Sequence, residues 1–375
     1  MGKNLHHETT KLKFSPSKNV TAAFERLGRT EDAHFSPDGK RLALAGFKSN
    51  RLMIVDVQFE NRNNVISIVS RDYLEIAGPS LKNPHGIFWI NDSTIIVASR
   101  FGGVDIFQLP LEKPASRMVD LAPVLTLSKA AFSKIKNAGS VSVAEISKDQ
   151  FEILLCNNFS NMITQHELDL REGFSVSNHS VYLQAKLEIP DGVAHSSSGG
   201  FIGVSNHVAG CVHVYEKSAV LGPKSLPTGT LVGLSNPHGL RFSEDEKFVF
   251  VADGAEPFVY VFFDKLKSWE GEHSPVAAIR VLSDDAFIRG RINPEEGGPK
   301  GIALSRGNCV LAVTCEEEPL SFYDVGPLIA TDKFAPFVKP AFPTVLDFII
   351  IPRKRFFVRM RSYYSKLFKG LFKRQ

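Results

Sequence analysis

Short apolar stretches alternate with polar turns along most of this chain, in a pattern that repeats six times. Each copy opens on a turn of small residues and continues into an apolar strand, a polar turn and two more strands. Two-residue alternation with β-branched or aromatic positions predicts strands. The copies start about 45 to 65 residues apart, at Glu31-Asp32-Ala33, Asn83-Pro84-His85-Gly86, Gly139-Ser140-Val141, Ile189-Pro190-Asp191-Gly192, Asn236-Pro237-His238-Gly239 and Gly298-Pro299-Lys300-Gly301.

The clearest copy, residues 236–263, predicts strands at Gly239–Phe242, Lys247–Ala252 and Phe258–Phe262. A small antiparallel sheet of this kind cannot bury both faces alone, and stacking such sheets around an axis builds a core. A repeat of this length is typical of propeller blades. The sequence therefore predicts an all-β, six-bladed β-propeller, with a seven-bladed propeller as the alternative.

The pattern divides the chain into four parts. Residues 1–29 form an N-terminal arm, in which Thr10–Phe14 is a candidate outer strand that closes the ring against the last blade. Residues 30–326 form the propeller, residues 327–351 a covering segment or linker, and residues 352–375 a basic amphipathic helical tail.

The cysteines and the apolar runs bear on location. Four cysteines lie in or beside predicted strands without the paired spacing of a metal site, which predicts buried free thiols. Met1–Phe14 lacks the apolar core of a signal peptide, and no later segment is long and apolar enough to span a bilayer. We expect a cytoplasmic, reducing location.

Charge is distributed unevenly. Residues 353–375 contain nine Lys or Arg and no acid, whereas the rest of the chain has 35 basic and 40 acidic residues. Pro352 suits the start of a helix. Such a helix has an apolar side and a basic side. Its candidate membrane-binding residues are Phe356, Arg359, Met360, Tyr363, Lys366, Leu367 and Leu371.

A basic amphipathic helix with aromatic residues lies at the surface of an anionic bilayer, where each basic residue contributes roughly 1 kcal/mol. The tail therefore predicts peripheral attachment to an anionic membrane surface. The alternative is a helix that caps the propeller or docks on a protein partner. Nucleic acid is the least favoured partner because the remainder of the chain is acidic.

The loops that enter the first strands and those that join the second and third strands meet at one end of a propeller axis. Cationic and amide side chains gathered there would bind a small anionic ligand. The candidate ligand-binding residues are Lys48, Arg100, Asn157, Asn206, Asp253 and Lys300. Carboxylates and imidazoles at the same end could hold a divalent cation or form a structural hydrogen-bond ring.

The motifs of serine hydrolases, nucleotide hydrolases and dehydrogenases are missing: the chain has no Gly-x-Ser-x-Gly, P-loop, His-Glu-x-x-His or dinucleotide fingerprint. The six openings resemble the six-bladed propellers of the gluconolactonase (senescence-marker) and strictosidine-synthase-like group, and more loosely the NHL and β-propeller lactonase families. The resemblance covers the blades and not the tail.

This resemblance implies one divalent metal ion, Ca²⁺, Mn²⁺ or Zn²⁺, held by Glu31, Asp191 and His238. Histidine in place of a carboxylate favours Zn²⁺ or Mn²⁺ over Ca²⁺. His85 and His207 are the candidate catalytic proton carriers.

The tail and the site residues together lead us to expect one of two functions. The first is a peripheral membrane propeller that binds a ligand or protein partner at its axial face and organises enzymes acting on lipid-linked substrates. The alternative is a metal-dependent lactone or ester hydrolase.

Overall fold

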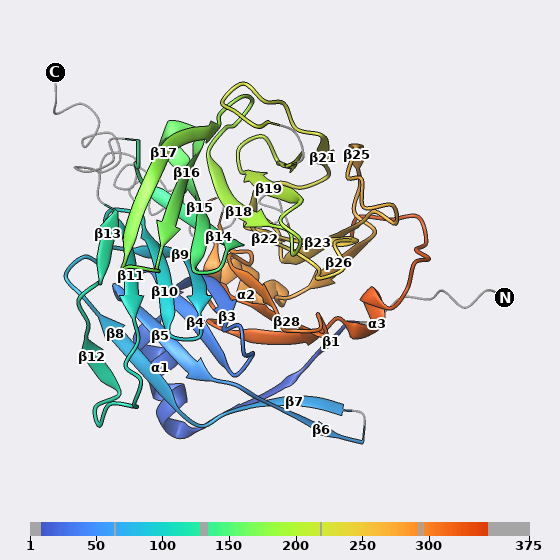
Figure 1. Cartoon of the computed structure of the whole chain (residues 1–375). Helices are drawn as coiled ribbons and strands as arrows, with labels where there is room; N and C mark the ends of the chain where they lie inside the picture. The colour runs from blue at the N-terminus through green and yellow to red at the C-terminus, as the bar shows by residue number, and fades with distance from the viewer. Residues whose placement is uncertain are drawn as a thin grey trace, which may run out of the picture.

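The computed structural model describes residues 9–343 except residues 64, 128–133, 218–219, 292 and 294–295. These residues are mostly strand and form a β-propeller (Figure 1). The described strands make seven sheets. The prediction of an all-β propeller is confirmed. Seven sheets do not support the preferred count of six blades and agree with the alternative count of seven, although the seventh sheet supplies no first strand to the central ring.

Six of these sheets share one organisation. Their first strands stand around a common axis, and each contacts the next until the ring closes; Figure 1 shows several of them grouped near the centre. The first strands are β3 (Thr30–Phe35), β9 (Pro84–Asn91), β14 (Ala138–Ser147), β18 (Pro190–His195), β22 (Pro237–Phe242) and β27 (Ile302–Leu304). Among the described residues, a cluster of buried apolar side chains fills each space between consecutive sheets of this ring.

Apart from the N-terminal β1, the outer strands of each sheet follow in chain order. The sheet of β3 adds β4 (Arg41–Gly46), β5 (Arg51–Asp56), β8 (Tyr73–Ala77) and β12 (Met118–Asp120), and that of β9 adds β10 (Thr94–Ser99), β11 (Val104–Gln108) and β13 (Leu125–Leu127). The sheet of β14 adds β15 (Gln150–Asn157), β16 (Met162–Asp169) and β17 (Ser175–Leu183), and that of β18 adds β19 (Phe201–Asn206), β20 (Cys211–Glu216), β21 (Gly229–Leu231) and β25 (Gly271–His273). The sheet of β22 adds β23 (Phe248–Asp253), β24 (Phe258–Phe263) and β26 (Ala277–Arg280), and that of β27 adds β28 (Val310–Val313), β29 (Ser321–Asp324) and β1 (Thr10–Lys11).

The N-terminal β1 pairs antiparallel with β29, at the place where the sequence predicts a closing strand. The seventh sheet consists of β2 (Lys13–Pro16), β7 (Val65–Ser70) and β6 (Gln58–Arg62). In Figure 1, β6 and β7 form a ribbon that extends away from the other sheets. Because β2 pairs with a strand about 54 residues later, no local repeat could indicate this sheet.

Helices are few in the described part of the chain. The helix α1 (Lys18–Leu27) begins where the Ser17 hydroxyl accepts a hydrogen bond from Val20 N, and it buries Val20, Ala23 and Leu27 at helical spacing. The others are α2 (Asp284–Gly290), α3 (Gly326–Ile329) and the 3₁₀ turn η1 (Asn158–Ser160). None of the helices among these residues has the length and hydropathy needed to cross a bilayer.

The Pro-x-Gly openings allow the first strands to approach one another closely. A Cβ on Gly86 would lie 2.7 Å from Ser140 Cα, and a Cβ on Gly239 would lie 2.7 Å from Lys300 O. A side chain at either position would therefore push the strands apart. The openings gather at one end of the axis, here called the site end. The turns between the first and second strands lie at the other end, the far end.

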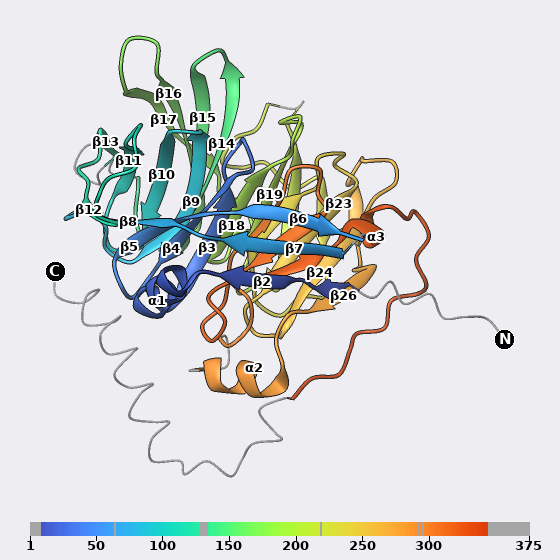
Figure 2. The same ribbon diagram turned by 90° about the horizontal axis from the view of Figure 1, so that it is seen from below.

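Residues 331–343, here called the strap, follow α3 along the outside of the propeller. Phe334 packs on Phe248, at the far-end start of β23, and Phe342 packs on Phe287 of α2. Since α2 lies in the connection that enters β27, the strap ends at the site end. Figure 2 shows the chain after α3 reaching α2. The linker residues 344–351 and the predicted helical tail 352–375 lie outside the described residues.

Candidate functional site

Three buried side chains from different sheets meet at the site end: Glu31 from β3, His85 from β9 and His238 from β22. Glu31 Oε2 lies 3.7 Å from Nε2 of each histidine. The three potential ligand atoms lie within 4.8 Å of one another, so this group could hold a metal ion. The sequence named Glu31 and His238 as metal ligands and His85 as a proton carrier. The structure places His85 in the same group.

One oxygen of Glu31 lacks a partner. Arg29 donates to Glu31 Oε1 at 2.5 Å, but the buried Oε2 accepts no hydrogen bond from any described residue. Leaving a buried carboxylate oxygen unpaired is costly, because the oxygen has lost its water. A cation placed between Oε2 and the two Nε2 atoms would remove that cost. The donor set therefore fits a divalent metal that accepts imidazole and carboxylate ligands.

Asp191, the third predicted metal ligand, lies beside this group at the start of β18. Its Oδ2 is 3.0 Å from His238 Nε2, and its Oδ1 is 3.1 Å from Arg100 Nη2 and also accepts from Asn158. Burial raises the pKa of the Asp191 carboxyl, but the positive charge of Arg100 beside it acts in the opposite direction, and the pKa lies well below its ordinary value. Asp191 is thus a carboxylate that orients His238, a member of the group, and Arg100, which lies beside the group.

His85 is held in one tautomer. Its Nδ1 lies 2.5 Å from Gly139 O, which can only accept, so Nδ1 carries the hydrogen. Its Nε2 then accepts from Arg100 Nη2, also at 2.5 Å. Burial, followed by the charge of Arg100, lowers the pKa of His85 to about 3, and burial lowers the pKa of His238 to about 3. Both imidazoles are neutral at pH 7, as metal ligands must be, but Arg100 competes for His85.

The predicted anion-binding lysines are already paired with acids. Lys300 is buried, and its Nζ lies 2.5 Å from Glu296 Oε2, while Lys48 pairs with Glu316. Burial raises the pKa of Glu296, but Lys300 and Arg29 lower it to about 2. Sequence reasoning missed Glu296, because it lies in the long connection between β26 and β27 and outside the repeated openings.

Asn157, Asn206 and Asp253 occupy equivalent positions, at the ends of β15, β19 and β23. In each case the side chain accepts a hydrogen bond from a backbone N–H in the loop that enters the first strand of its own sheet. The distances are 2.7 Å to Lys136 N for Asn157, 2.5 Å to Glu188 N for Asn206 and 2.7 Å to Ser235 N for Asp253. These contacts fix the loops. The assignment of the three residues to ligand binding stays a prediction.

His207 flanks the group in the loop after β19 and is half-buried. Its Nδ1 lies 3.3 Å from Pro237 O, so this bond selects the tautomer in which Nε2 is the acceptor. Its ring is 6.4 Å from that of His238 and nearly perpendicular to it, at 83°. His207 is therefore placed to accept a proton beside the group.

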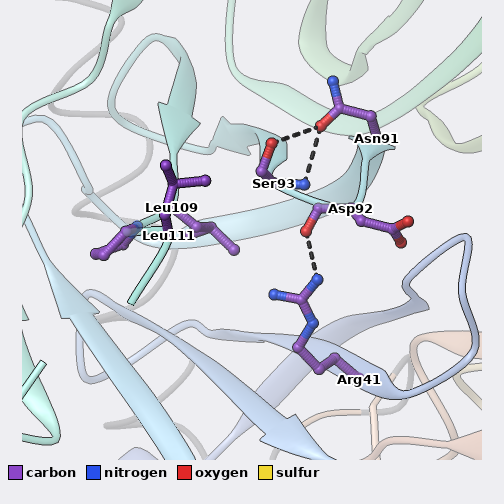
Figure 3. A pocket seen from close by; sticks show the side chains of 7 residues that line it. Arg41, Asn91, Asp92, Ser93, Leu109 and Leu111 are labelled. Carbon is purple, nitrogen blue, oxygen red and sulfur yellow. Dashed lines mark hydrogen bonds between the residues drawn. The ribbon is translucent and has the colours of Figure 1, made fainter. Parts of the chain in front are cut away.

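A separate pocket lies at the far end (Figure 3). It is lined by Arg41, Asn91, Asp92, Ser93, Leu109, Pro110 and Leu111. Its polar groups bind one another: Arg41 donates to Asp92 O, and Ser93 donates to Asn91 Oδ1. None of the residues that the sequence proposed lines this pocket, and it shows no convergent titratable group.

Comparison with protein-family models gives no match to this chain, and no curated protein matches it either. Of the predicted resemblance to the gluconolactonase group, the structure supports the propeller arrangement alone.

Proposed function

We propose that the site end binds a divalent transition metal through Glu31, His85 and His238, and that the protein is a metal-dependent hydrolase of lactones or esters. The observation that carries this proposal is the unpartnered Oε2 of Glu31, buried 3.7 Å from two neutral imidazole nitrogens. Nitrogen donors favour Zn²⁺ or Mn²⁺ over Ca²⁺, which takes six to eight oxygen ligands.

A metal held there would act as a Lewis acid toward a carbonyl group and lower the pKa of a water molecule. The protein's own residues supply the remaining functions. Arg100, ion-paired with Asp191 at 3.1 Å, carries a guanidinium that would grip an anionic group of the substrate. His207 would accept a proton at Nε2.

The test is elemental analysis of the purified, tag-free protein, followed by titration of the metal-free protein with Zn²⁺, Mn²⁺ and Ca²⁺. We expect stoichiometric Zn²⁺ or Mn²⁺. An ion that binds only the folded state should stabilise it by about 2.7 kcal/mol at a hundred times its dissociation constant, which is measured as a rise in Tm. No bound metal and an unchanged Tm with all three ions would contradict the proposal.

We also propose peripheral attachment to an anionic membrane at the cytoplasmic face, where the propeller would bind a ligand or protein partner and organise enzymes that act on lipid-linked substrates. The supporting observation is the run of nine basic residues without an acid in residues 353–375, interleaved with aromatic residues. Replacing Phe356, Tyr363 and Leu367 together by Ser should release the protein from phosphatidylserine-containing vesicles in a sedimentation assay. Undiminished sedimentation of this variant would rule out the tail as the anchor.

A further inference from the structure

Three exposed apolar side chains surround part of the site end. Phe101, Phe159 and Val208 are 62%, 51% and 55% exposed. Each lies between the second and third strands of its sheet, in three consecutive sheets of the ring. The equivalent loop of the sheet of β22 instead buries Ala255. Apart from Val338 of the strap, which lies beside Lys339 and is 81% exposed, the apolar exposure at this end is therefore concentrated over the sheets of β9, β14 and β18.

Exposed lysines accompany these apolar residues. They lie in the loops that enter the same three first strands, so they belong to the same end of the same sheets. They are Lys82, Lys134, Lys136 and Lys186. In the described part of these loops Glu188 is the one exposed acid. Together, Phe101, Phe159, Val208 and these four lysines are here called the rim. It combines exposed apolar groups with a net positive charge.

The far end differs in charge. Its turns between first and second strands carry both signs of charge: the exposed acids are Asp92, Asp149, Glu244 and Asp245, and the exposed bases are Lys40, Lys148 and Arg306. Exposed apolar residues occur there too, such as Ile146 and Leu266. An anionic surface would therefore attract the rim, with its excess of lysines, more strongly than these turns of mixed charge. Charge distinguishes the rim from the far-end turns where apolar exposure does not.

We propose that the rim docks on an anionic lipid bilayer, so that the site end faces the membrane. Aromatic and aliphatic side chains would enter the headgroup boundary, while the lysines pair with acidic headgroups. Lysines interspersed among single apolar side chains suit a lipid surface better than a protein interface, whose buried core is depleted of charged residues. This inference deepens the proposed membrane association and does not depend on the metal.

The strap supports the same orientation. Its Lys339 lies 2.6 Å from Glu256, in the site-end loop between β23 and β24, and Phe342 packs on Phe258 and Phe287. The described chain thus ends at the site end, and the basic residues 353–375 follow after a connection of nine residues. The rim and the last described residue of the strap therefore lie at the same end of the propeller, and an anionic bilayer there would face both.

The first experiment compares full-length variants on phosphatidylcholine vesicles with and without phosphatidylserine. Phe101→Ser with Phe159→Ser should weaken binding to the phosphatidylserine vesicles by about tenfold or more. The matched control, Ile146→Ser with Leu266→Ser, removes two exposed apolar residues from the far end and should bind like the unmodified protein. If the rim variant binds as well as the control variant, the inference is overturned. That holds even if the tail variant with Ser at positions 356, 363 and 367 loses binding.

The second experiment reports orientation directly. Cys309, which the sequence predicted to be buried, is instead an exposed thiol at the far end and can carry a polarity-sensitive fluorophore without mutation. The same label on Val208→Cys, in a Cys309→Ser background, probes the rim. We expect vesicles to shift the emission of the label at position 208 to the blue and to leave the label at position 309 unchanged. A shift at position 309, or none at position 208 on vesicles that sediment the protein, would overturn the inference. In that case the rim would instead be assigned to a protein partner.

Discussion

Glu31→Gln should lower the affinity for Zn²⁺ or Mn²⁺ by at least about a hundredfold, because even partners outside the ligand shell cost 10- to 100-fold. Glutamine keeps the size of the side chain and removes the charge that lies between His85 and His238. Lactone or ester hydrolysis should fall in proportion. Metal affinity is measured by titration of the chelator-treated protein, and hydrolysis by a pH-indicator assay on a panel of lactones and aryl esters.

Two further variants make this test specific. Glu152→Gln removes the same charge from another buried carboxylate, which lies 2.7 Å from His195 Nε2 and outside the metal group, so metal affinity should stay unchanged. Arg100→Gln removes the cation that competes for His85 Nε2, so metal affinity should rise by about tenfold, or about 1.4 kcal/mol. Equal affinity in Glu31→Gln and the unmodified protein would show that the group is a structural hydrogen-bond ring.

Acid should unfold the metal-free protein at a mildly acidic pH. His85 and His238 are buried and His34 is half-buried, and loss of hydration lowers the pKa of each from 6.5 to about 3. Below pH 6.5 the unfolded chain binds a proton on each of these histidines, whereas the folded protein binds none until about pH 3. Stability is therefore complete above pH 6.5 and is lost as the pH falls toward 3. The loss is up to about 1.4 kcal/mol per pH unit for each histidine.

With three such histidines the total loss from pH 6.5 to pH 4.5 approaches the whole stability of an ordinary domain, about 5 to 15 kcal/mol. Urea unfolding at half-unit pH steps, with chelator present, measures the slope. His34→Gln should reduce the slope by up to about 1.4 kcal/mol per pH unit around pH 5. It lies outside the metal group, so it should leave metal affinity unchanged. A free energy of unfolding that is constant between pH 6.5 and pH 5 would contradict buried, neutral histidines.

The repeated part of the fold follows from the sequence with small errors at the boundaries. The strands predicted at Lys247–Ala252 and Phe258–Phe262 are β23 (Phe248–Asp253) and β24 (Phe258–Phe263). Such strands are visible locally because side chains alternate between two buried faces. The seventh sheet was not predicted, since β2 and β7 pair across distant parts of the chain. The helix α1 was also missed, within a segment that sequence reasoning treated as an arm.

Only the part of the site that lies in the repeated openings was predicted from the sequence. Glu31, Asp191 and His238 stand in the repeated openings, and the ring brings them together with His85, which the sequence had given another role. The contact of Arg100 with His85 and the pairing of Glu296 with Lys300 could not be foreseen. The first contact depends on the directions of two side chains. The second depends on a connection that does not repeat along the chain. Neither leaves a periodic pattern in the sequence.

By itself, the sequence determined that this chain is a ring of small antiparallel sheets, because a two-residue period and regularly spaced turns are local properties that each copy carries independently. It also determined that the last 23 residues carry nine basic residues and no acid, whereas acids outnumber bases in the rest of the chain. Only the tertiary structure decided which openings meet, that Glu31 Oε2 is left without a partner, and that Phe101, Phe159 and Val208 share one end with exposed lysines. These features depend on closure of the ring, which brings together residues that are far apart along the chain and that no local pattern relates.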